Sequence, residues 1–407
     1  MEFTPASSPL EAAIDPAGEE LVDWARAFIP ELRAARDEID AASRTPHDIA
    51  AQMSDAGLWR MAVPRELGGL QSGISVWKRA VTEIGRGDGG VAWGLTLNSA
   101  AAWMAANLYP RHVVDEVFAE PDARFAGVFS GRGVKAHKVE GGIVVDKGMW
   151  FFNSGVYQAD WNLLGVPGFN EAGEPVFPGG VAIVPMSDVT ILHDWNPSGL
   201  RGSGSTNVAM EGIFIADDRI VSLQACNEGT QPAIFGAEDP FYRVAFGPLM
   251  VLILAFPVLG LGKHMLESFL EALPKRDIKL TFYTKQNLAA VTHLQLGEVS
   301  AKIDTADAII ERGCEAMQYW ADRNETMPKI ERARITRDTA YADQLVWEAI
   351  DTLANAAGGS WAWKASELNR IWQDAKVATM HPFVNVASNL ESYGRMLAGI
   401  EPDLMAV

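Results

Sequence analysis

Hydrophobic positions recur with helical spacing through the first part of the chain, to about residue 120. Between Glu19 and Ala42, apolar side chains follow one another at intervals of three and four, which places them on one face of a helix. Glycines at 57, 87 and 89 punctuate the pattern where helices would end or begin. The same spacing predicts further helices over 48–58, 76–86 and 90–108, and a short one after Pro110.

The pattern changes between about Arg124 and Ile220. Helical periodicity fades, and short apolar runs such as RFAGVFS and NVAMEGIFI alternate with turn residues. Runs of this length and spacing are typical of strands in a sandwich or barrel, and about six to eight of them fit the segment. We therefore expect a β domain in the middle of the chain.

Long helical patterns return near Phe235 and continue to the end of the chain. They predict helices over 242–272, 286–324, 330–356 and 362–398, and four long helices in succession favour an antiparallel bundle. The expected fold class is α+β, with an N-terminal helical domain (1–122), a middle β-barrel or sandwich (123–232) and a C-terminal four-helix bundle (233–407).

One apolar stretch is long enough to require a test against membranes. Val244 to Gly262 carries no charge and approaches the length of a membrane span. It stands alone, has no basic flanking pattern, and contains Pro248 and Pro257. A helix buried on all sides within the bundle is the favoured interpretation, and no membrane partner is expected.

Composition and charge exclude several classes of function. The 407 residues carry a formal net charge of -18, and a surface this acidic repels nucleic acid and anionic lipid. Cys226 and Cys314 stand far apart, and the seven histidines form no HxH or HExxH string, so no metal site is predicted. Residues 1–20 are polar and acidic, without the pattern of a secretion signal, so the expected location is cytoplasmic.

Three strings in the chain match one superfamily in the right order. They are VPRELGGL with EIGRGDGGVAWGL (63–70 and 83–95), WNPSGLRGSGSTNVAMEGIFI (195–215), and AAGGSWAWKASELNRIWQDAKVATMH (356–381). They resemble, in turn, the N-terminal domain, the β-domain signature and the last two helices of acyl-CoA dehydrogenases. The resemblance covers nearly the whole chain and implies an acyl-CoA dehydrogenase-like fold.

Residues near the C-terminus indicate which branch of the superfamily the chain resembles. Dehydrogenases carry a Glu-Gly-Thr turn whose Glu abstracts a substrate proton, whereas this stretch reads WQDAKVATMHPFVN, with Gln373 where an Arg is usual and His381 nearby. MWFFNSGVYQADW (149–161) is similar to the Trp-x-x-x-Ser-Gly string of flavin monooxygenases. That branch includes the hydroxyphenylacetate, dibenzothiophene and indole oxygenases and the sugar nitrososynthases.

The resemblance implies the oxygenase component of a two-component monooxygenase. Such an enzyme uses reduced FMN or FAD and O₂, through a C4a-(hydro)peroxyflavin, to hydroxylate an aromatic or heteroaromatic small molecule. A separate NAD(P)H:flavin reductase is the expected partner, because no nicotinamide-binding unit appears in the sequence. A homotetramer, arranged as a dimer of dimers, is also implied.

Two residues are the candidates for catalysis. Ser154 would accept a hydrogen bond from the flavin N5 position, and Gly155 after it would let the backbone approach a flat ring. His381 would either accept a proton from the substrate or only donate a hydrogen bond. Without the family context, Asn-Ser-Gly reads as a turn and a lone histidine on a helix reads as structural.

The resemblance also implies cofactor and substrate contacts. Asn98 replaces a histidine of several monooxygenases, and it reads equally well as an ordinary helix residue. The Gly358-Gly359 pair reads equally well as a helix C-cap, and aromatic residues are more often core than contact. The flavin candidates are Phe152, Asn153, Ser154, Arg201, Ser203 and Ser205, with Lys279, Gly358 and Gly359 lent by a neighbouring subunit. The substrate candidates are Trp93, Asn98, Phe129, Tyr157 and Phe383, with Trp150 and Trp161 as further aromatic neighbours.

Three other functions are weighed against this one. N-oxygenation of an amine, as in nitrososynthases, would use the same residues. A true acyl-CoA dehydrogenase would need a carboxylate base near His381, and the sequence offers none there. A catalytically silent flavin- or acyl-CoA-binding scaffold would not depend on Ser154.

Overall fold

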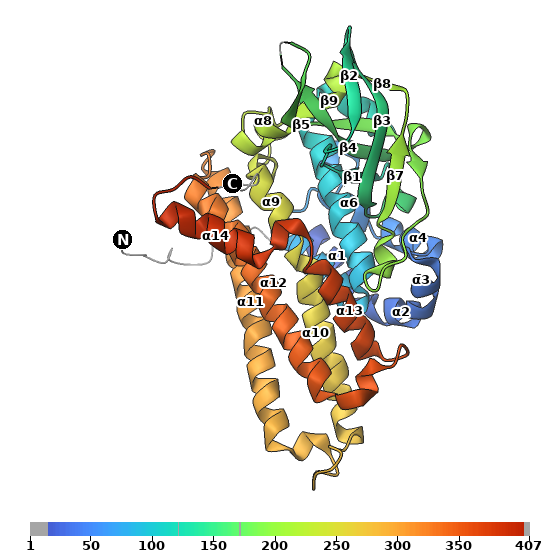
Figure 1. Ribbon diagram of the computed structural model, residues 1–407, viewed down its shortest axis with the longest axis vertical. Helices are drawn as coiled ribbons and strands as arrows, with labels where there is room; N and C mark the ends of the chain where they lie inside the picture. Colours follow the sequence, from blue (N-terminus) through green and yellow to red (C-terminus); the bar gives the residue numbers. More distant parts are fainter. Residues whose placement is uncertain (1–14, 121, 171, 403–407) are drawn as a thin grey trace.

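The computed structural model describes residues 15–120, 122–170 and 172–402. The chain forms a layer of helices, then two β-sheets, then a long helical bundle (Figure 1). The sheets lie at one end of the molecule, and the hairpin of α10 (Ala255–Ala272) and α11 (Ala290–Asp322) reaches the other (Figure 1). Helix α6 (Gly89–Leu108) runs between the sheets and the bundle (Figure 1). Most of the segment expected to lack a secretion signal, residues 1–14, lies outside the described residues.

The prediction of one continuous helix over 19–42 is wrong. The chain forms three short helices there, because Pro30 lacks the N–H that a continuous helix needs and instead stands in the first turn of α2. The N-terminal helices are α1 (Pro16–Ala27), α2 (Ile29–Ala34), α3 (Arg36–Ala42), α4 (His47–Asp55), α5 (Ile74–Gly87), α6 (Gly89–Leu108) and α7 (Arg111–Val117).

Helix α6 is the central helix of the N-terminal part. The Asp88 side chain caps its first turn by accepting a hydrogen bond from the Val91 N–H. Nearly every residue of α6 is buried, and it has no polar face, so other elements cover it on all sides. Gly90 and Gly94 allow it to approach the loop before β7 closely, since a Cβ at Gly90 would lie 2.6 Å from the Gly202 nitrogen.

The middle domain is a pair of sheets, as the sandwich pattern predicted. One sheet has the order β1-β4-β5-β9, and the other has the order β2-β3-β7-β6 with β8 also paired to β3. Within the described part of the chain there are nine strands, one more than the upper expectation, and the three-residue β9 lies outside the apolar runs that predict strands. The strands are β1 (Phe125–Val128), β2 (Lys135–Val139), β3 (Gly142–Asn153), β4 (Trp161–Phe169), β5 (Pro175–Pro185), β6 (Thr190–Ile191), β7 (Thr206–Met210), β8 (Ile213–Ala216) and β9 (Ile220–Ser222).

Trp150, which the sequence placed among the aromatic neighbours of the site, is a core residue, the more frequent role of aromatic side chains. Its side chain is 1% exposed and belongs to the core of the β domain, where its indole N–H donates to the Gly165 carbonyl at 2.8 Å. Trp161, at the start of β4, is half-buried beside the guanidinium of Arg219. Both aromatic residues therefore serve the packing of the β domain.

The C-terminal bundle differs from its prediction at two breaks. The helix predicted over 242–272 is divided between α9 and α10, and the one predicted over 362–398 is divided by Pro382, which ends α13 and opens a short 3₁₀ turn. The elements are α8 (Leu223–Glu228), α9 (Phe246–Leu252), α10 (Ala255–Ala272), α11 (Ala290–Asp322), α12 (Lys329–Ala356), α13 (Glu367–Ala378) and α14 (Val386–Leu397).

The long apolar segment lies inside this bundle. An 18-residue window of Phe246–Lys275 has a mean hydropathy of 1.9, so the segment is long and apolar enough to span a membrane, but 89% of that window is buried within the protein. A Cβ at Gly260 would lie 2.5 Å from the Thr82 carbonyl, so α10 crosses α5 at backbone contact. The expected core helix is thus the one observed.

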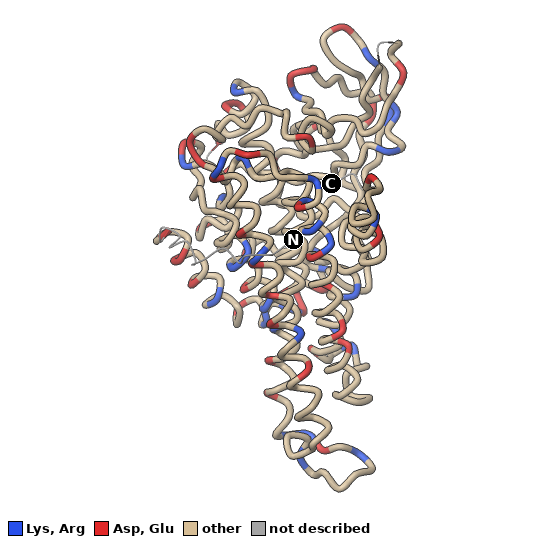
Figure 2. Tube along the Cα trace, turned by 90° about the vertical axis from the view of Figure 1, so that its left-hand side faces the viewer, with Lys and Arg blue, Asp and Glu red and all other residues tan. Residues whose placement is uncertain are grey.

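Acidic and basic residues are interspersed along the long helices (Figure 2). Lys78 of α5 is buried and pairs with Asp307 and Glu311 of α11, each at 2.5 Å. These pairs join the N-terminal helices to the bundle, so the three parts of the chain pack as one unit around α6 and α10.

Candidate active site

Three serine hydroxyls form a hydrogen-bonded chain where β3 meets β7. Ser154 follows the last residue of β3, and its Oγ lies 2.7 Å from the Oγ of Ser205. The Oγ of Ser205 lies in turn 2.6 Å from that of Ser203, which donates to the Leu200 carbonyl at 2.7 Å. All three serines are 2–3% exposed. Pairing of Asn153 with Thr206 in the sheet brings their backbones together.

The loop that carries Ser203 and Ser205 is held from two other domains. The Leu200 N–H donates to the Asp374 carboxylate of α13 at 2.6 Å, and Thr45 donates to the Gly202 carbonyl at 2.9 Å. A Cβ at Gly199 would lie 2.2 Å from the Gln373 carbonyl, so only glycine fits against α13 there. Burial raises the pKa of Asp374, and the nearby Arg370 guanidinium opposes that rise.

Helix α6 covers the inner side of this chain. Gly155 has φ of +69°, and a Cβ there would lie 2.0 Å from Oδ1 of Asn98. The Asn98 amide donates to the Phe125 carbonyl, while its Oδ1 accepts no hydrogen bond from the part of the chain described. Asn98 is therefore a buried residue that packs on the Ser154-Gly155 turn, which excludes its interpretation as a helix surface residue.

His381 stands at the break between α13 and the 3₁₀ turn, and not within a helix as predicted. Its Nδ1 accepts a hydrogen bond from the Phe383 N–H at 3.2 Å. The neutral ring must then carry its proton on Nε2. Burial lowers the pKa of His381 to about 4, so the imidazole is neutral at pH 7.

The two candidate catalytic residues contact neighbouring positions of α6. The His381 ring lies 5.8 Å from the Trp93 ring and 5.3 Å from the Phe383 ring. Gly94, the next residue of α6, is close to the serine chain, because a Cβ there would lie 3.5 Å from the Ser203 carbonyl and 3.8 Å from Cα of Gly155. Trp93, Phe383, His381 and the serines thus form one region.

The two β3 residues before Ser154, Phe152 and Asn153, lie in different environments. Phe152 is 68% exposed, has φ of +62°, and meets the Trp195 ring edge-on at 6.1 Å. Asn153 is fully buried and donates to Asn162 at 2.9 Å. Phe152 and Trp195 are available to pack on a flat ring, whereas Asn153 is committed to the interior of the β domain.

Three other candidates, Phe129, Tyr157 and Arg201, lie apart from this region or have side-chain contacts other than those expected. Phe129 packs on Phe246 of α9, with ring centroids 6.2 Å apart. The Tyr157 hydroxyl meets His193 Nδ1 at 3.1 Å, and its ring lies under the Arg44 guanidinium. Arg201 is half-buried in the loop. The Ser205 hydroxyl bonds to Ser203 and Ser154, and the Ser203 hydroxyl donates to the Leu200 carbonyl, so neither hydroxyl is directed at a phosphate.

The remaining cofactor candidates belong to the α10–α11 connection and to the turn after α12, and that connection lies at the end of the molecule away from the sheets (Figure 1). Lys279 is exposed and pairs with Asp277 at 2.8 Å. The glycine pair follows α12, where Gly358 has φ of +66°. Hydrogen bonds from Arg276 to Ser360 and from Gln286 to the Ala356 carbonyl bring the two segments together. The Ser154 hydroxyl contacts Ser205 and the Phe152 carbonyl, and no hydrogen bond among the described residues joins it to these segments.

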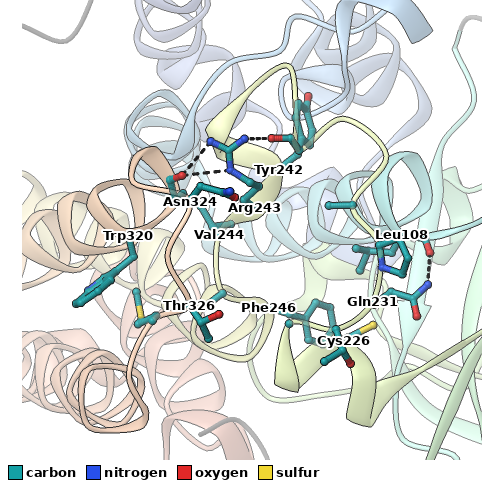
Figure 3. A pocket seen from close by; sticks show the side chains of 18 of the residues that line it. Leu108, Cys226, Gln231, Tyr242, Arg243, Val244, Phe246, Trp320, Asn324 and Thr326 are labelled. Carbon is teal, nitrogen blue, oxygen red and sulfur yellow. Dashed lines mark hydrogen bonds between the residues drawn. The ribbon is translucent and has the colours of Figure 1, made fainter.

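A cavity of about 490 Å³ lies elsewhere, between the second half of α6, the segment before α9 and the α11–α12 connection (Figure 3). Trp103, Phe246 and Trp320 supply aromatic walls, and Arg243 lines it while donating to the Ala321 and Gly236 carbonyls. Neither Ser154 nor His381 lines this cavity, so the described pocket is separate from the candidate active site.

Sequence reasoning missed the residues that support the serine chain. Asp374 and Thr45 hold its loop, and Trp195 adds an aromatic face beside Phe152. Asp374 lies within the string that carries the family resemblance, but nothing in its spacing marks it as a partner of Leu200. Such long-range contacts become visible only in the folded chain.

Comparisons with known proteins give a consistent result. The profile of the acyl-CoA dehydrogenase N-terminal domain matches residues 15–109, and that of the C-terminal domain matches residues 252–386. The chain is 25% identical over 406 residues to the oxygenase component of p-hydroxyphenylacetate 3-hydroxylase from Acinetobacter baumannii, covering 98% of this chain and 93% of the relative. It is 26% identical to the oxygenase subunit HsaA of a flavin-dependent monooxygenase from Rhodococcus jostii, covering 87% and 92%.

A solved structure also matches over nearly the full length. XiaF from Streptomyces sp., in complex with FADH2 and glycerol, superposes with a TM-score of 0.87 at 26% identity, covering 96% of this chain and 97% of XiaF. Agreement in both sequence profile and fold extends from the N-terminal helices to the bundle.

Proposed function

Because the chain belongs to the acyl-CoA dehydrogenase family, in its flavin-dependent monooxygenase branch, we propose that it is the oxygenase component of a two-component monooxygenase. It uses reduced FMN or FAD and O₂ to insert one oxygen atom into an aromatic or heteroaromatic small molecule. The relatives are named hydroxylases and monooxygenases, which favours oxygenation over the dehydrogenation of an acyl thioester.

The described residues fit a reduced flavin ring. Reduced flavin, when bound, supplies the electrons that activate O₂ and carries an N–H at its N5 position. Ser154 offers a buried hydroxyl oxygen at the mouth of the β3–β7 pair, and the exposed Phe152 ring and the half-buried Trp195 ring offer apolar surface for a flat group. The serine chain is the single observation that carries this assignment, because it presents a hydroxyl acceptor from which bulk water is excluded.

His381 is proposed as a hydrogen-bond donor and not as a base. Its Nδ1 is occupied by the Phe383 N–H, so the neutral ring has no free lone pair in the plane. Its lowered pKa, about 4, also disfavours the protonated product of base catalysis at pH 7. The Nε2–H is the group that His381 can offer to a substrate or to oxygen.

We also propose that a second copy of the chain completes the site. The end of the bundle that carries Lys279, Gly358 and Gly359 exposes large apolar side chains, with Leu280 and Phe282 fully exposed and Leu288 and Leu294 63% and 76% exposed. Apolar surface of this kind is a feature of oligomer interfaces. It supports a homotetramer in which this end meets the flavin of a neighbouring subunit.

The flavin must arrive already reduced, so the proposed partner is a separate NAD(P)H:flavin reductase. The names of the relatives, which specify an oxygenase component or subunit, support this division of labour. Cys226 and Cys314 are buried free thiols, which is compatible with the proposed cytoplasmic location.

Isotope incorporation tests the proposed function. Reduced FMN or FAD is supplied chemically to the protein under ¹⁸O₂, with phenols, indoles and amino sugars as candidate substrates. Mass spectrometry should find one ¹⁸O atom on carbon of a phenol or indole. Oxygen on the nitrogen of an amino sugar would instead identify an N-oxygenase, and dehydrogenated acyl thioesters without ¹⁸O would contradict oxygenation.

A further inference from the structure

The direction of each hydrogen bond in the serine chain follows from counting protons. A serine hydroxyl has one proton to donate and two lone pairs to accept with. The Leu200 carbonyl can only accept, so its 2.7 Å contact with Ser203 uses the single proton of Ser203. Ser203 must then accept at its 2.6 Å contact with Ser205, which consumes the proton of Ser205.

The same count fixes Ser154. Since the proton of Ser205 is donated to Ser203, the 2.7 Å contact between Ser205 and Ser154 requires Ser154 to donate. The proton of Ser154 therefore points into the protein, toward Ser205. Only lone pairs of Ser154 remain for a group bound outside the chain.

The reverse direction is disfavoured by distance. It would leave the Ser154 proton with only the Phe152 carbonyl, 3.5 Å away, as an acceptor among the described residues, and would leave Ser203 and the Leu200 carbonyl as two acceptors 2.7 Å apart. A separation of 2.7 Å is ideal for a hydroxyl donor, whereas 3.5 Å is at the limit of a hydrogen bond. The short contact decides the direction.

The Leu200 carbonyl, which accepts the last hydrogen bond of the serine chain, is itself held in place. Leu200 has φ of +55°, its N–H is held by Asp374, and the loop is tied to Thr45 through the Gly202 carbonyl. The Gly155 N–H donates to the Ser203 carbonyl at 2.8 Å, which holds the two ends of the chain in register. With all three hydroxyls almost fully buried, water does not compete for these protons.

We infer that Ser205 and Ser203 are positioning residues that hold the Ser154 hydroxyl as an obligate acceptor, and thereby make the site select reduced over oxidised flavin. This inference rests on the proposed function. Reduced flavin carries a proton at N5 and can donate to Ser154, whereas N5 of oxidised flavin is an acceptor and would face a second lone pair. Loss of Ser205 releases the proton of Ser154, which can then turn to donate to oxidised N5.

Binding measurements test this inference without turnover. The Kd of oxidised flavin is measured in air and that of reduced flavin under anaerobic conditions, with FMN and FAD each used as the probe. The wild-type protein should bind the reduced form more tightly. Ser205→Ala should lower the ratio of the Kd of oxidised flavin to the Kd of reduced flavin about tenfold, which is the scale of one buried hydrogen bond. The change should come mainly from tighter binding of oxidised flavin.

A double-mutant cycle distinguishes positioning from general structural support. If Ser205 acts through Ser154, Ser205→Ala should have no further effect on the Kd ratio once Ser154→Ala is present. Ser203→Ala removes the acceptor of Ser205 and should change the ratio in the same direction, which provides a second variant if Ser205→Ala fails to fold. Thr339→Val removes another buried hydroxyl, one that donates to the Ile335 carbonyl in α12, and should leave the ratio unchanged.

The outcomes separate the inference from the function on which it rests. An unchanged ratio in folded Ser205→Ala and Ser203→Ala, or effects that add to that of Ser154→Ala, would overturn the positioning role while leaving the monooxygenase proposal intact. Failure of the wild-type protein to bind either form of either flavin would instead overturn the proposed function.

Discussion

The imidazole of His381 lies 5.8 Å from the indole of Trp93, although Trp93 belongs to the first third of the chain and His381 to its last tenth. The contact joins α6 to the break after α13. Trp93 is 5% exposed, so it shields one side of the imidazole from water. This shielding is part of the burial that lowers the pKa of His381.

Removal of the indole should therefore release the histidine. We expect Trp93→Ala to admit water and to raise the pKa of His381 from about 4 toward its ordinary value of 6.5. Ring resonances of His381 followed by NMR titration measure this shift. The control is Trp24→Ala, which removes a tryptophan of α1 that stacks on Phe28, and it should leave the titration of His381 unchanged. Equal pKa values in all three proteins would contradict the role of Trp93.

The lowered pKa of His381 also sets a dependence of stability on pH. Between pH 6.5 and about 4, the unfolded chain takes up a proton at His381 that the folded chain does not. Folding stability from this residue is thus present above pH 6.5 and is lost as pH falls through that window, by at most about 1.4 kcal/mol per pH unit. His381→Gln should lose less stability than the wild-type protein in urea unfolding at pH 6.5, 5.5 and 4.5. Parallel losses in the two proteins would show that His381 is equally protonated in both states.

Gly155 is required by both its backbone conformation and its neighbour. Gly155→Ala places a Cβ at φ of +69° and 2.0 Å from the Asn98 amide oxygen, so we expect a lower Tm and a loss of roughly 1–3 kcal/mol. Gly394→Ala, in α14, meets nothing within 4 Å and should be neutral or slightly stabilising. Thermal unfolding of the two variants makes the comparison. A Gly155→Ala protein as stable as Gly394→Ala would mean that the turn after Ser154 relaxes freely.

Asp343 in α12 is a buried carboxyl group, and neither of its oxygens has a hydrogen-bond partner among the described residues. Burial raises its pKa well above the ordinary 3.8. The unfolded chain releases the Asp343 proton above pH 3.8 while the folded chain retains it, so this residue costs stability increasingly as pH rises. Asp343→Asn should gain stability over the wild-type protein from pH 5 to pH 8, whereas Asp304→Asn, at an exposed position, should not. A gain that does not grow with pH would argue against a neutral carboxyl at Asp343.

The order of the three parts is predicted well from the sequence, because burial of a core imposes a characteristic hydrophobic periodicity on helices and on strands. It overestimates helix lengths where a proline intervenes. Pro30 and Pro382 both divide helices whose apolar spacing continues across the break, and the second break changes the setting of His381 from mid-helix to a cap.

The candidate site is predicted in part. Ser154, Ser203 and Ser205 are identified by two family strings within the β domain, and their contact arises from strand pairing that periodicity does not reveal. Asn98 and Trp93 lie against that region, whereas Trp150 belongs to the core. Lys279 and Gly358 remain predictions that depend on a second subunit, because their segments contact each other and form no hydrogen bond with the serine chain among the described residues.

The most direct test of the account follows the fate of oxygen. Protein loaded anaerobically with reduced flavin is mixed with O₂ in the absence of substrate, and the release of hydrogen peroxide and the appearance of oxidised flavin are timed. The account predicts a long delay in the wild-type protein relative to free flavin, and a delay shortened at least about tenfold in Ser154→Ala, which loses the hydrogen bond at N5. Release in wild-type protein as fast as from free flavin, or a delay that Ser154→Ala does not change, would contradict it.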